Sequence, residues 1–236
     1  IKKKEGEINK SLAAKKKQAQ QLQAAITAAI NREIAAAKKE AKDRADKERK
    51  DKEAADRIAK ENAKTNPTTT ATNPTATVTA PVVKKDEPKK IESYLEYNKE
   101  DIALGASFEI NKGRLPFPVD NGYVSINFGS YTIPGTTIKG SQDFITIASP
   151  AGSTVKACYE GEVVSVFDVG GNTAVMIKHG KYFTTYSNLS SASVSKGQNV
   201  KTGQVIGRVG TNLDGDGELN FVLARENQMI NPSPWL

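Results

Sequence analysis

Residues 152–188 read GSTVKACYEGEVVSVFDVGGNTAVMIKHGKYFTTYSN, and this stretch decides the fold. Apolar and polar residues alternate on both sides of the GGN at 170–172, which is typical of two strands joined by a hairpin turn. The sequence therefore predicts an all-β domain over 113–236, built as a small antiparallel sandwich or barrel. Runs of the same kind recur at 123–129 (YVSINFG), 193–210 (SVSKGQNVKTGQVIGRVG) and 217–228 (GELNFVLARENQ).

Residues 1–64 are rich in Ala, Lys, Glu and Gln, contain no Pro, and predict a helical arm. At 1.5 Å per residue such a helix would be ~95 Å long. One helix cannot bury an apolar seam alone, so we expect a coiled coil with a second helix, a second copy or an upstream segment; the alternative is a frayed single helix. Lys15 interrupts the seam, which thins to alanines and Ile58 beyond Ile34; its apolar positions are Ile8, Leu12, Ala19, Leu22, Ile26 and Ala29.

Two further segments separate this arm from the β domain. Residues 65–88 consist largely of Thr, Pro, Asn and Ala, and lack the large apolar groups that packing requires. We expect them to be a disordered linker. Residues 89–112 predict a short helical segment that stops near Gly113, with one apolar face made by Ile91, Leu95, Ile102 and Phe108.

The formal net charge of +7 resides in the N-terminal half, because the chain from Gly113 onward holds nine Lys/Arg and nine Asp/Glu. In the helical arm the charges alternate in sign and no aromatic residues are interleaved with them. That pattern is typical of a solvated helix, so we expect no nucleic-acid partner. No stretch is apolar enough to span a bilayer, and no signal peptide is visible. The chain begins at Ile1, within a helical pattern, and we expect it to be a piece of a longer protein.

Glu218 and Asn220 are polar residues within an otherwise apolar run, GELNFVLA. Alternate side chains of a strand share a face, so these two side chains should point the same way. We expect that direction to be away from the face that Leu219 and Val222 bury. The sequence thus predicts a polar pair that looks into a groove.

Five blocks of the sequence, in order, carry a resemblance to a known family: NKGRLPFPV…FG, ASPAGSTVKACYEGEVVSV, VMIKHGKYFTTYSNLS, VSKGQNVKTGQVIGRVG and ELNFVL…MINPSPWL. Together they resemble the LytM-like (lysostaphin-type) zinc metallopeptidases, which cut peptidoglycan cross-links, over residues 112–236. The helical arm, the short helix and the entry NKGRLPFPV most resemble murein hydrolase activators of the EnvC type. The resemblance implies a LytM-like β domain.

In that family three motifs hold or assist the zinc ion: a His-x-x-x-Asp pair, a Tyr-x-His-Leu and a His-x-His. The resemblance puts other residue types at all five of these positions. Asp143 stands next to the first position and would be closest to it if the alignment slipped by one residue. The residues at the five positions are Gln142, Thr146, Asn188, Glu218 and Asn220.

A catalytic zinc site takes three imidazole, thiolate or carboxylate ligands and leaves one position open, whereas neutral amides and hydroxyls bind zinc poorly. The chain has one histidine, His179, and one cysteine, Cys158, so a single molecule cannot build a histidine-based zinc site. The resemblance places His179 outside the metal site, and we expect an exposed or half-buried turn histidine. Cys158 lies in an alternating run, which favours a small buried thiol. We expect no metal and no cofactor.

The sequence gives weaker support to two other functions, calcium binding and nucleophilic catalysis. Asn212, Asp214 and Asp216 imitate the start of a calcium loop, but the twelfth position is Leu223 where such a loop has a bidentate Glu. The serines in YSNLSSASVS (186–195) have no histidine base in a recognisable motif, so nucleophilic catalysis is not expected.

The sequence therefore favours a non-enzymatic activator of peptidoglycan (N-acetylmuramoyl-L-alanine) amidases, which binds a helix or loop of the amidase in its metal-free groove and moves a self-inhibiting segment. The resemblance implies a periplasmic or cell-envelope location and an envelope or division complex reached through the coiled coil. Peptidoglycan is a further candidate partner. The groove residues would be Gln142, Thr146, Asn188, Glu218 and Asn220.

Four alternatives stay open at this point. The domain could bind peptidoglycan passively as a scaffold, or it could be a residual metallopeptidase that uses another site or metal. The polar groove residues could be ordinary surface residues without a partner. The helical segment at 91–110 could pack on the domain or close the groove.

Overall fold

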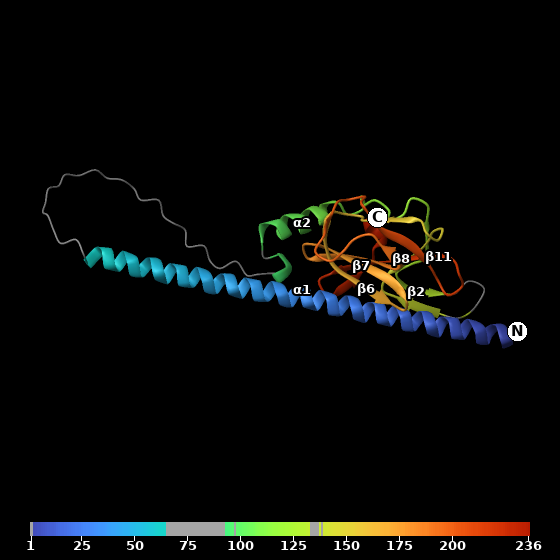
Figure 1. Ribbon diagram of the computed structural model, residues 1–236. Coiled ribbons are helices and arrows are strands. Elements are labelled where there is room, and N and C mark those ends of the chain that lie inside the picture. The colour runs from blue at the N-terminus through green and yellow to red at the C-terminus, as the bar shows by residue number, and fades with distance from the viewer. Residues whose placement is uncertain (1, 65–92, 97, 133–136, 138) are drawn as a thin grey trace.

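The computed structural model describes residues 2–64, 93–96, 98–132, 137 and 139–236 (Figure 1). The expected linker at 65–88 lies outside these residues, and so does Ile91. The helices are α1 (Lys2–Lys64), η1 (Tyr94–Glu96), α2 (Lys99–Ile110) and η2 (Ser233–Trp235). The strands are β1 (Tyr123–Ile126), β2 (Gly129–Thr132), β3 (Lys139–Gln142), β4 (Ile145–Ala148), β5 (Thr154–Lys156), β6 (Gly161–Val169), β7 (Asn172–His179), β8 (Tyr182–Ala192), β9 (Asn199–Val200), β10 (Val205–Thr211), β11 (Gly217–Arg225) and β12 (Gln228–Ile230).

The antiparallel β domain expected from the sequence is confirmed. The main sheet of the described residues runs β1-β4-β11-β10-β8-β7-β6-β9, with β12 beside β11 and β5 beside β10. Its centre is the long hairpin of β7 and β8, whose turn at Gly180 has a φ of +66°. Strand β8 also pairs with both β10 and β11. Strands β2 and β3 form a separate two-stranded ribbon.

Side chains alternate across the main sheet, so β6, β7, β8 and β11 each contribute residues to two apolar clusters. On β11, Leu219, Phe221 and Leu223 belong to the larger cluster, on what we call the inner face of the sheet. Val222 and Ala224 belong to the smaller cluster, on the outer face. The expectation for Val222 was therefore wrong: by strand alternation it lies on the same side as Glu218 and Asn220, opposite Leu219.

The outer face is covered by α1, which runs along the β domain and extends well beyond it (Figure 1). Its residues Leu22, Ile26, Ala29 and Ile30 are at most 5% exposed. They pack against side chains of the sheet and its edges, among them Phe144, Val164, Met176, Phe183, Val222 and Ala224.

The predicted helix is thus present, but the partner of its seam differs from the expected one. Among the described residues the seam between Leu22 and Ile30 is buried by the chain's own sheet and not by a second helix. Ile58, on the projecting part, is 60% exposed, and pairing of that part in a coiled coil stays a prediction. No helix among the described residues combines the length and the apolar composition needed to cross a membrane.

Helix α2 packs on the β7–β8 hairpin. Asn98 caps its start, with Oδ1 accepting a hydrogen bond from the backbone N–H of Asp101 at 2.6 Å. Phe108 is fully buried against the hairpin, and Asp101 forms an ion pair with Lys178 at 3.0 Å. Ile102, expected on the buried face, is instead 49% exposed. The chain turns after the helix at Gly113, where φ is +77°, close to the predicted stop.

His179 is the main correction among single residues, because it is fully buried and not exposed or half-buried. Its ring stacks on Phe108 with 4.8 Å between centroids. Nδ1 lies 2.6 Å from the carbonyl oxygen of Glu160, which only accepts, so Nδ1 carries the proton. Nε2 lies 2.9 Å from the hydroxyl of Thr184 and accepts from it. Burial lowers the pKa of His179 to about 4, so the ring is neutral and structural.

The expectation of a buried thiol at Cys158 is confirmed, since the residue has no exposed surface. Burial raises the pKa of this thiol to about 12. The backbone N–H of Cys158 donates to the hydroxyl of Tyr186 at 2.8 Å. Such a thiol is a packing residue and not a nucleophile.

The burial of Ile26 predicts that its replacement by Asp releases α1 from the sheet. Burying an isoleucine stabilises by about 1.5–3 kcal/mol, and a buried carboxylate without a partner adds a further cost. Amide hydrogen exchange should become faster in residues 12–34 of Ile26→Asp and not in the inner-face strands. The matched control is Ile58→Asp on the exposed part of the same helix, which should leave exchange in residues 12–34 unchanged. Equal protection in both variants would contradict the docking described here.

The lowered pKa of His179 predicts a loss of stability on acidification. The folded pKa of about 4 lies below the ordinary value of 6.5, so the unfolded chain binds the proton first as the pH falls. The free energy of unfolding should therefore decrease between pH 6.5 and 4, by up to about 3 kcal/mol from this group. Because the chain has one histidine, its ring signal can be titrated directly by NMR. A midpoint near 6.5 in the folded protein would contradict the buried, neutral ring.

Candidate functional site

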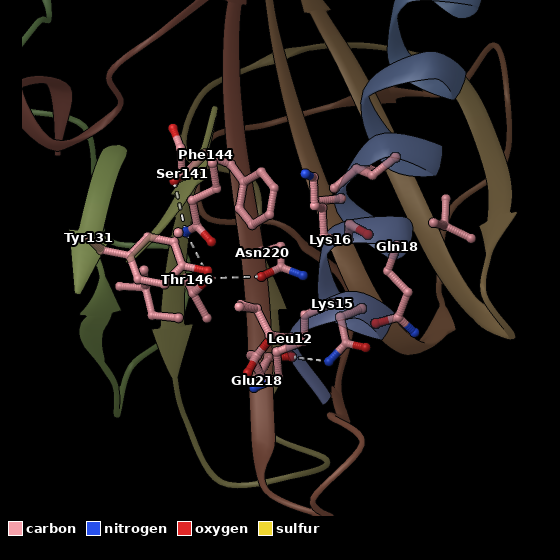
Figure 2. A pocket seen from close by; sticks show the side chains of 18 of the residues that line it. Leu12, Lys15, Lys16, Gln18, Tyr131, Ser141, Phe144, Thr146, Glu218 and Asn220 are labelled. Atoms are coloured by element: carbon pink, nitrogen blue, oxygen red, sulfur yellow. Dashed lines mark hydrogen bonds between the residues drawn. The ribbon is translucent and has the colours of Figure 1, made fainter. Parts of the chain in front are cut away.

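A cavity of 470 Å³ lies on the outer face of the sheet, beside the apolar contact with α1 (Figure 2). All five residues expected in the groove line it. One wall is made by the early turns of α1 through Leu12, Lys15, Lys16, Gln18, Ala19 and Leu22. The opposite walls come from β3, β4, β8 and β11, and contain Gln142, Thr146, Asn188, Glu218 and Asn220.

Three of the five expected residues form a chain of hydrogen bonds. Gln142 Nε2 donates to the hydroxyl of Thr146 at 3.1 Å, and this hydroxyl donates to Asn220 Oδ1 at 3.1 Å. The same Gln142 nitrogen also lies 3.1 Å from the carbonyl oxygen of Phe144. The pairing of β4 with β11 places Thr146 directly opposite Asn220. Gln142 Nε2, the Thr146 hydroxyl and Asn220 Oδ1 are therefore all hydrogen-bonded within the chain.

The other two expected residues are joined at the far end of the cavity. Asn188 adopts a φ of +66°, a conformation that asparagine tolerates better than most residues. Its Nδ2 donates to the backbone carbonyl of Glu218 at 2.7 Å, and its Oδ1 accepts from Asn172 at 2.6 Å. Glu218 Oε2 accepts from Asn212 Nδ2 at 3.1 Å.

Asp143, the neighbour of the first expected position, takes part in a different contact. Its Oδ2 accepts a hydrogen bond from Gln23 of α1 at 3.0 Å, and it does not line the cavity. The geometry therefore favours Gln142 over Asp143 at this position of the groove. Gln142 and Thr146 are 9% and 2% exposed, so they are not ordinary surface residues.

The donor set of the groove does not suit a zinc ion. Gln142 and Asn220 offer neutral amides and Thr146 a hydroxyl, and these groups are hydrogen-bonded to one another. Zinc sites use imidazole, thiolate or carboxylate, and Glu218 alone in this groove supplies one of these. Within the described residues, no three His, Cys, Asp or Glu side chains gather where they could hold a metal ion. No catalytic step through a metal is derived from this arrangement.

The residues that imitate the start of a calcium loop, from Asn212 to Asp216, form a hydrogen-bonded turn. Asn212 Oδ1 accepts the backbone N–H groups of Asp214 and Asp216, at 2.9 and 3.0 Å. This oxygen organises the turn that leads into β11, as asparagine commonly does. Asp214 lies 3.7 Å from Lys15 of α1. The segment is therefore a turn that faces α1.

Sequence reasoning missed two walls of the cavity. The first is the β2–β3 ribbon, which adds Tyr131, Lys139 and Ser141. Burial, followed by the negative charge of Glu218, raises the pKa of the Tyr131 hydroxyl, which therefore stays protonated and able to donate. The second wall is α1, and its only signal in the sequence was Lys15 interrupting the apolar seam.

Residues 141–232, which include all five expected positions, match peptidase family M23 and carry the LytM-type domain that the sequence resembled. The chain is 33% identical over 137 residues to an uncharacterized protein of Neisseria meningitidis, covering 57% of this chain and 22% of that protein. It is 36% identical over 95 residues to the murein hydrolase activator EnvC of Escherichia coli, covering 39% and 23% respectively. The chain thus spans less than a quarter of the length of these two curated relatives.

Among solved structures the chain is similar to Csd3 of Helicobacter pylori. The identity is 26% with a TM-score of 0.45, and the match covers 52% of this chain and 34% of that chain.

The hydrogen-bonded chain predicts that Thr146→Val destabilises the fold. Valine has the same shape as threonine but leaves Gln142 Nε2 and Asn220 Oδ1 each without the hydroxyl, a loss of about 1–3 kcal/mol for buried groups. Thr211→Val, at an exposed position of β10, is the matched control and should change stability by less than about 0.5 kcal/mol. Urea denaturation measures both values. An equal change in the free energy of unfolding for the two substitutions would show that Thr146 behaves as an ordinary surface residue.

Proposed function

We propose that this protein is a non-enzymatic activator of peptidoglycan amidases, the enzymes that cleave the N-acetylmuramoyl-L-alanine bond. The observation that carries the proposal is the hydrogen-bonded set of Gln142, Thr146 and Asn220. These residues stand at positions where the resemblance to metallopeptidases puts zinc ligands. A groove that keeps its walls while its polar groups bond to one another suits binding better than metal-dependent hydrolysis.

The outer face next to the cavity supports the kind of contact proposed. It already holds an amphipathic helix, since α1 buries Leu22, Ile26 and Ile30 there. A helix or loop of an amidase would bind this surface in place of α1, as in helix-in-groove recognition. The polar residues of the cavity would then fix the register of the bound segment through hydrogen bonds.

Activation by such a protein requires that it prefer one state of its target. A ligand shifts a conformational equilibrium only by the difference in its affinity for the two states. Binding in the groove would therefore favour the form of the amidase in which a self-inhibiting segment has moved away from the active site. The relative named as a murein hydrolase activator, EnvC, supports this choice over passive binding to peptidoglycan.

The proposal includes a location in the cell envelope, because peptidoglycan lies outside the cytoplasm. The projecting part of α1, whose Ile58 is exposed, would connect the β domain to an envelope or division complex through a coiled coil. The same proposal includes direct contact with peptidoglycan. It also includes residues 65–88 as the linker between the helical arm and the β domain.

The test is an amidase assay with dye-labelled peptidoglycan, in which the purified chain is mixed with amidases from the same organism. One amidase should release dye faster when the chain is present, and the chain alone should release none. Asn220→Ala should raise the concentration for half-maximal activation about tenfold, the effect of losing about 1.4 kcal/mol of binding. Asn121→Ala, an exposed asparagine outside the cavity, is the matched control and should behave as the unchanged protein.

Three results would count against the proposal. Unchanged dye release with every amidase would point to a passive peptidoglycan-binding module. Cleavage of cross-linked muropeptides by the chain alone, together with stoichiometric zinc by elemental analysis and loss of activity with a chelator, would establish a peptidase. Equal activation by Asn220→Ala and Asn121→Ala would place the binding surface outside the groove.

A further inference from the structure

The three-residue helix η1 connects α1 to the rest of the protein through side-chain contacts. It lies against α1, just before the start of α2 (Figure 1). Leu95 is 1% exposed and belongs to the outer-face cluster that buries the apolar seam of α1. Lys38 Nζ lies over the ring of Tyr94, 5.1 Å from its centroid, which adds a cation–π contact. Lys38 follows Ile30 by about two turns, so η1 extends the docked part of α1 toward its C-terminal end.

Glu96 anchors η1 to the β7–β8 hairpin. Its Oε2 accepts a hydrogen bond from Lys181 Nζ at 3.3 Å, and the two side chains are 16% and 18% exposed. An ion pair that is largely withdrawn from water is costly to break, because each charge would be left without its partner. Lys181 also approaches Glu109 of α2, but at 3.9 Å, and Glu109 is 52% exposed. Glu96 is therefore the main partner of Lys181.

Gly105 of α2 leaves room for the Glu96 carboxylate. A Cβ atom at position 105 would collide with Glu96 Oε1. Glycine within a helix is less favourable than alanine, because it loses more backbone freedom on folding. Position 105 thus carries a residue that is poor for α2 itself, and the close approach of Glu96 gives a reason for it.

We propose that η1 is a latch that holds α1 on the outer face of the sheet, and that the Glu96–Lys181 ion pair keeps this latch closed. When the pair opens, Leu95 can leave the outer-face cluster, and α1 loses one of the surfaces against which it is docked. The inner-face cluster does not include Leu95, so the β domain stays folded while α1 loosens. Only the effect of the latch on an amidase, which would bind the outer face in place of α1, rests on the proposed function.

The test measures amide hydrogen exchange in the full 236-residue chain with Glu96→Gln, which keeps the shape of the side chain and removes its charge. Exchange in residues 22–38 of α1 should become about fivefold faster, because a hydrogen bond between charged groups is roughly twice as strong as one between neutral groups. Exchange in the inner-face strands should not change. The matched control, Glu100→Gln, removes the same charge from an exposed position of α2 and should leave exchange in α1 unchanged.

Gly105→Ala separates the latch from the stability of α2. Alanine favours a helix, so exchange within α2 should become slower. The added Cβ displaces the Glu96 carboxylate, so exchange in residues 22–38 should become faster, as it does in Glu96→Gln. The double variant should exchange no faster in α1 than Gly105→Ala alone, because both substitutions act through one ion pair.

Three outcomes would overturn the inference. The first is unchanged exchange in α1 in Glu96→Gln and Gly105→Ala, and the second is an equal effect of the control Glu100→Gln. The third is an equal acceleration in the inner-face strands, which would mean that the whole domain has loosened.

The amidase assay is read separately, and Glu96→Gln should lower the concentration for half-maximal activation. Faster exchange in α1 without activation of any amidase would leave the latch in place and remove the proposed function. Activation by the unchanged chain, together with α1 exchange that the two substitutions do not alter, would do the reverse.

Discussion

The strict alternation of side chains along β11 is the constraint on which the rest of the molecule depends. Leu219, Phe221 and Leu223 complete the inner cluster, and the residues between them are forced onto the other face. That outer face carries Asn220 in the cavity and Val222 under α1. A shift of one residue in the pairing with β4 and β8 would exchange the two sets and abolish both the core and the cavity. The polar site and the surface that binds α1 are therefore neighbouring parts of the outer face of β11.

The β domain could be predicted from the sequence because its signals are local. The alternating runs on either side of the turn at 170–172 specify strands, and the spacing of the blocks specifies their order. The helix over residues 2–64 could be predicted for the same reason, from its composition and its apolar spacing. Within the site, Gln142, Thr146, Asn188, Glu218 and Asn220 do lie together around one cavity.

What could not be predicted depends on contacts between distant segments. The spacing of Leu22, Ile26 and Ile30 indicates that the helix needs an apolar partner. It does not distinguish a sheet from a second helix, because either can bury the same apolar stripe. The burial of His179 could not be predicted because its neighbours in the sequence are those of a turn. Its burial depends on stacking against Phe108 of α2, which is distant in the sequence. The lysines of α1 pointed to a solvated surface until the helix was placed against the sheet.

The separate β2–β3 ribbon has a consequence for how this site could diversify. The ribbon supplies Tyr131, Lys139 and Ser141 to the cavity, yet its strands pair with each other and not with the main sheet. A two-stranded ribbon contributes little to the stability of a domain whose core lies elsewhere. Substitutions on it could therefore reshape the mouth of the cavity and its selectivity while the scaffold beneath stays intact, which makes the ribbon a natural starting point for redesigning what the groove accepts.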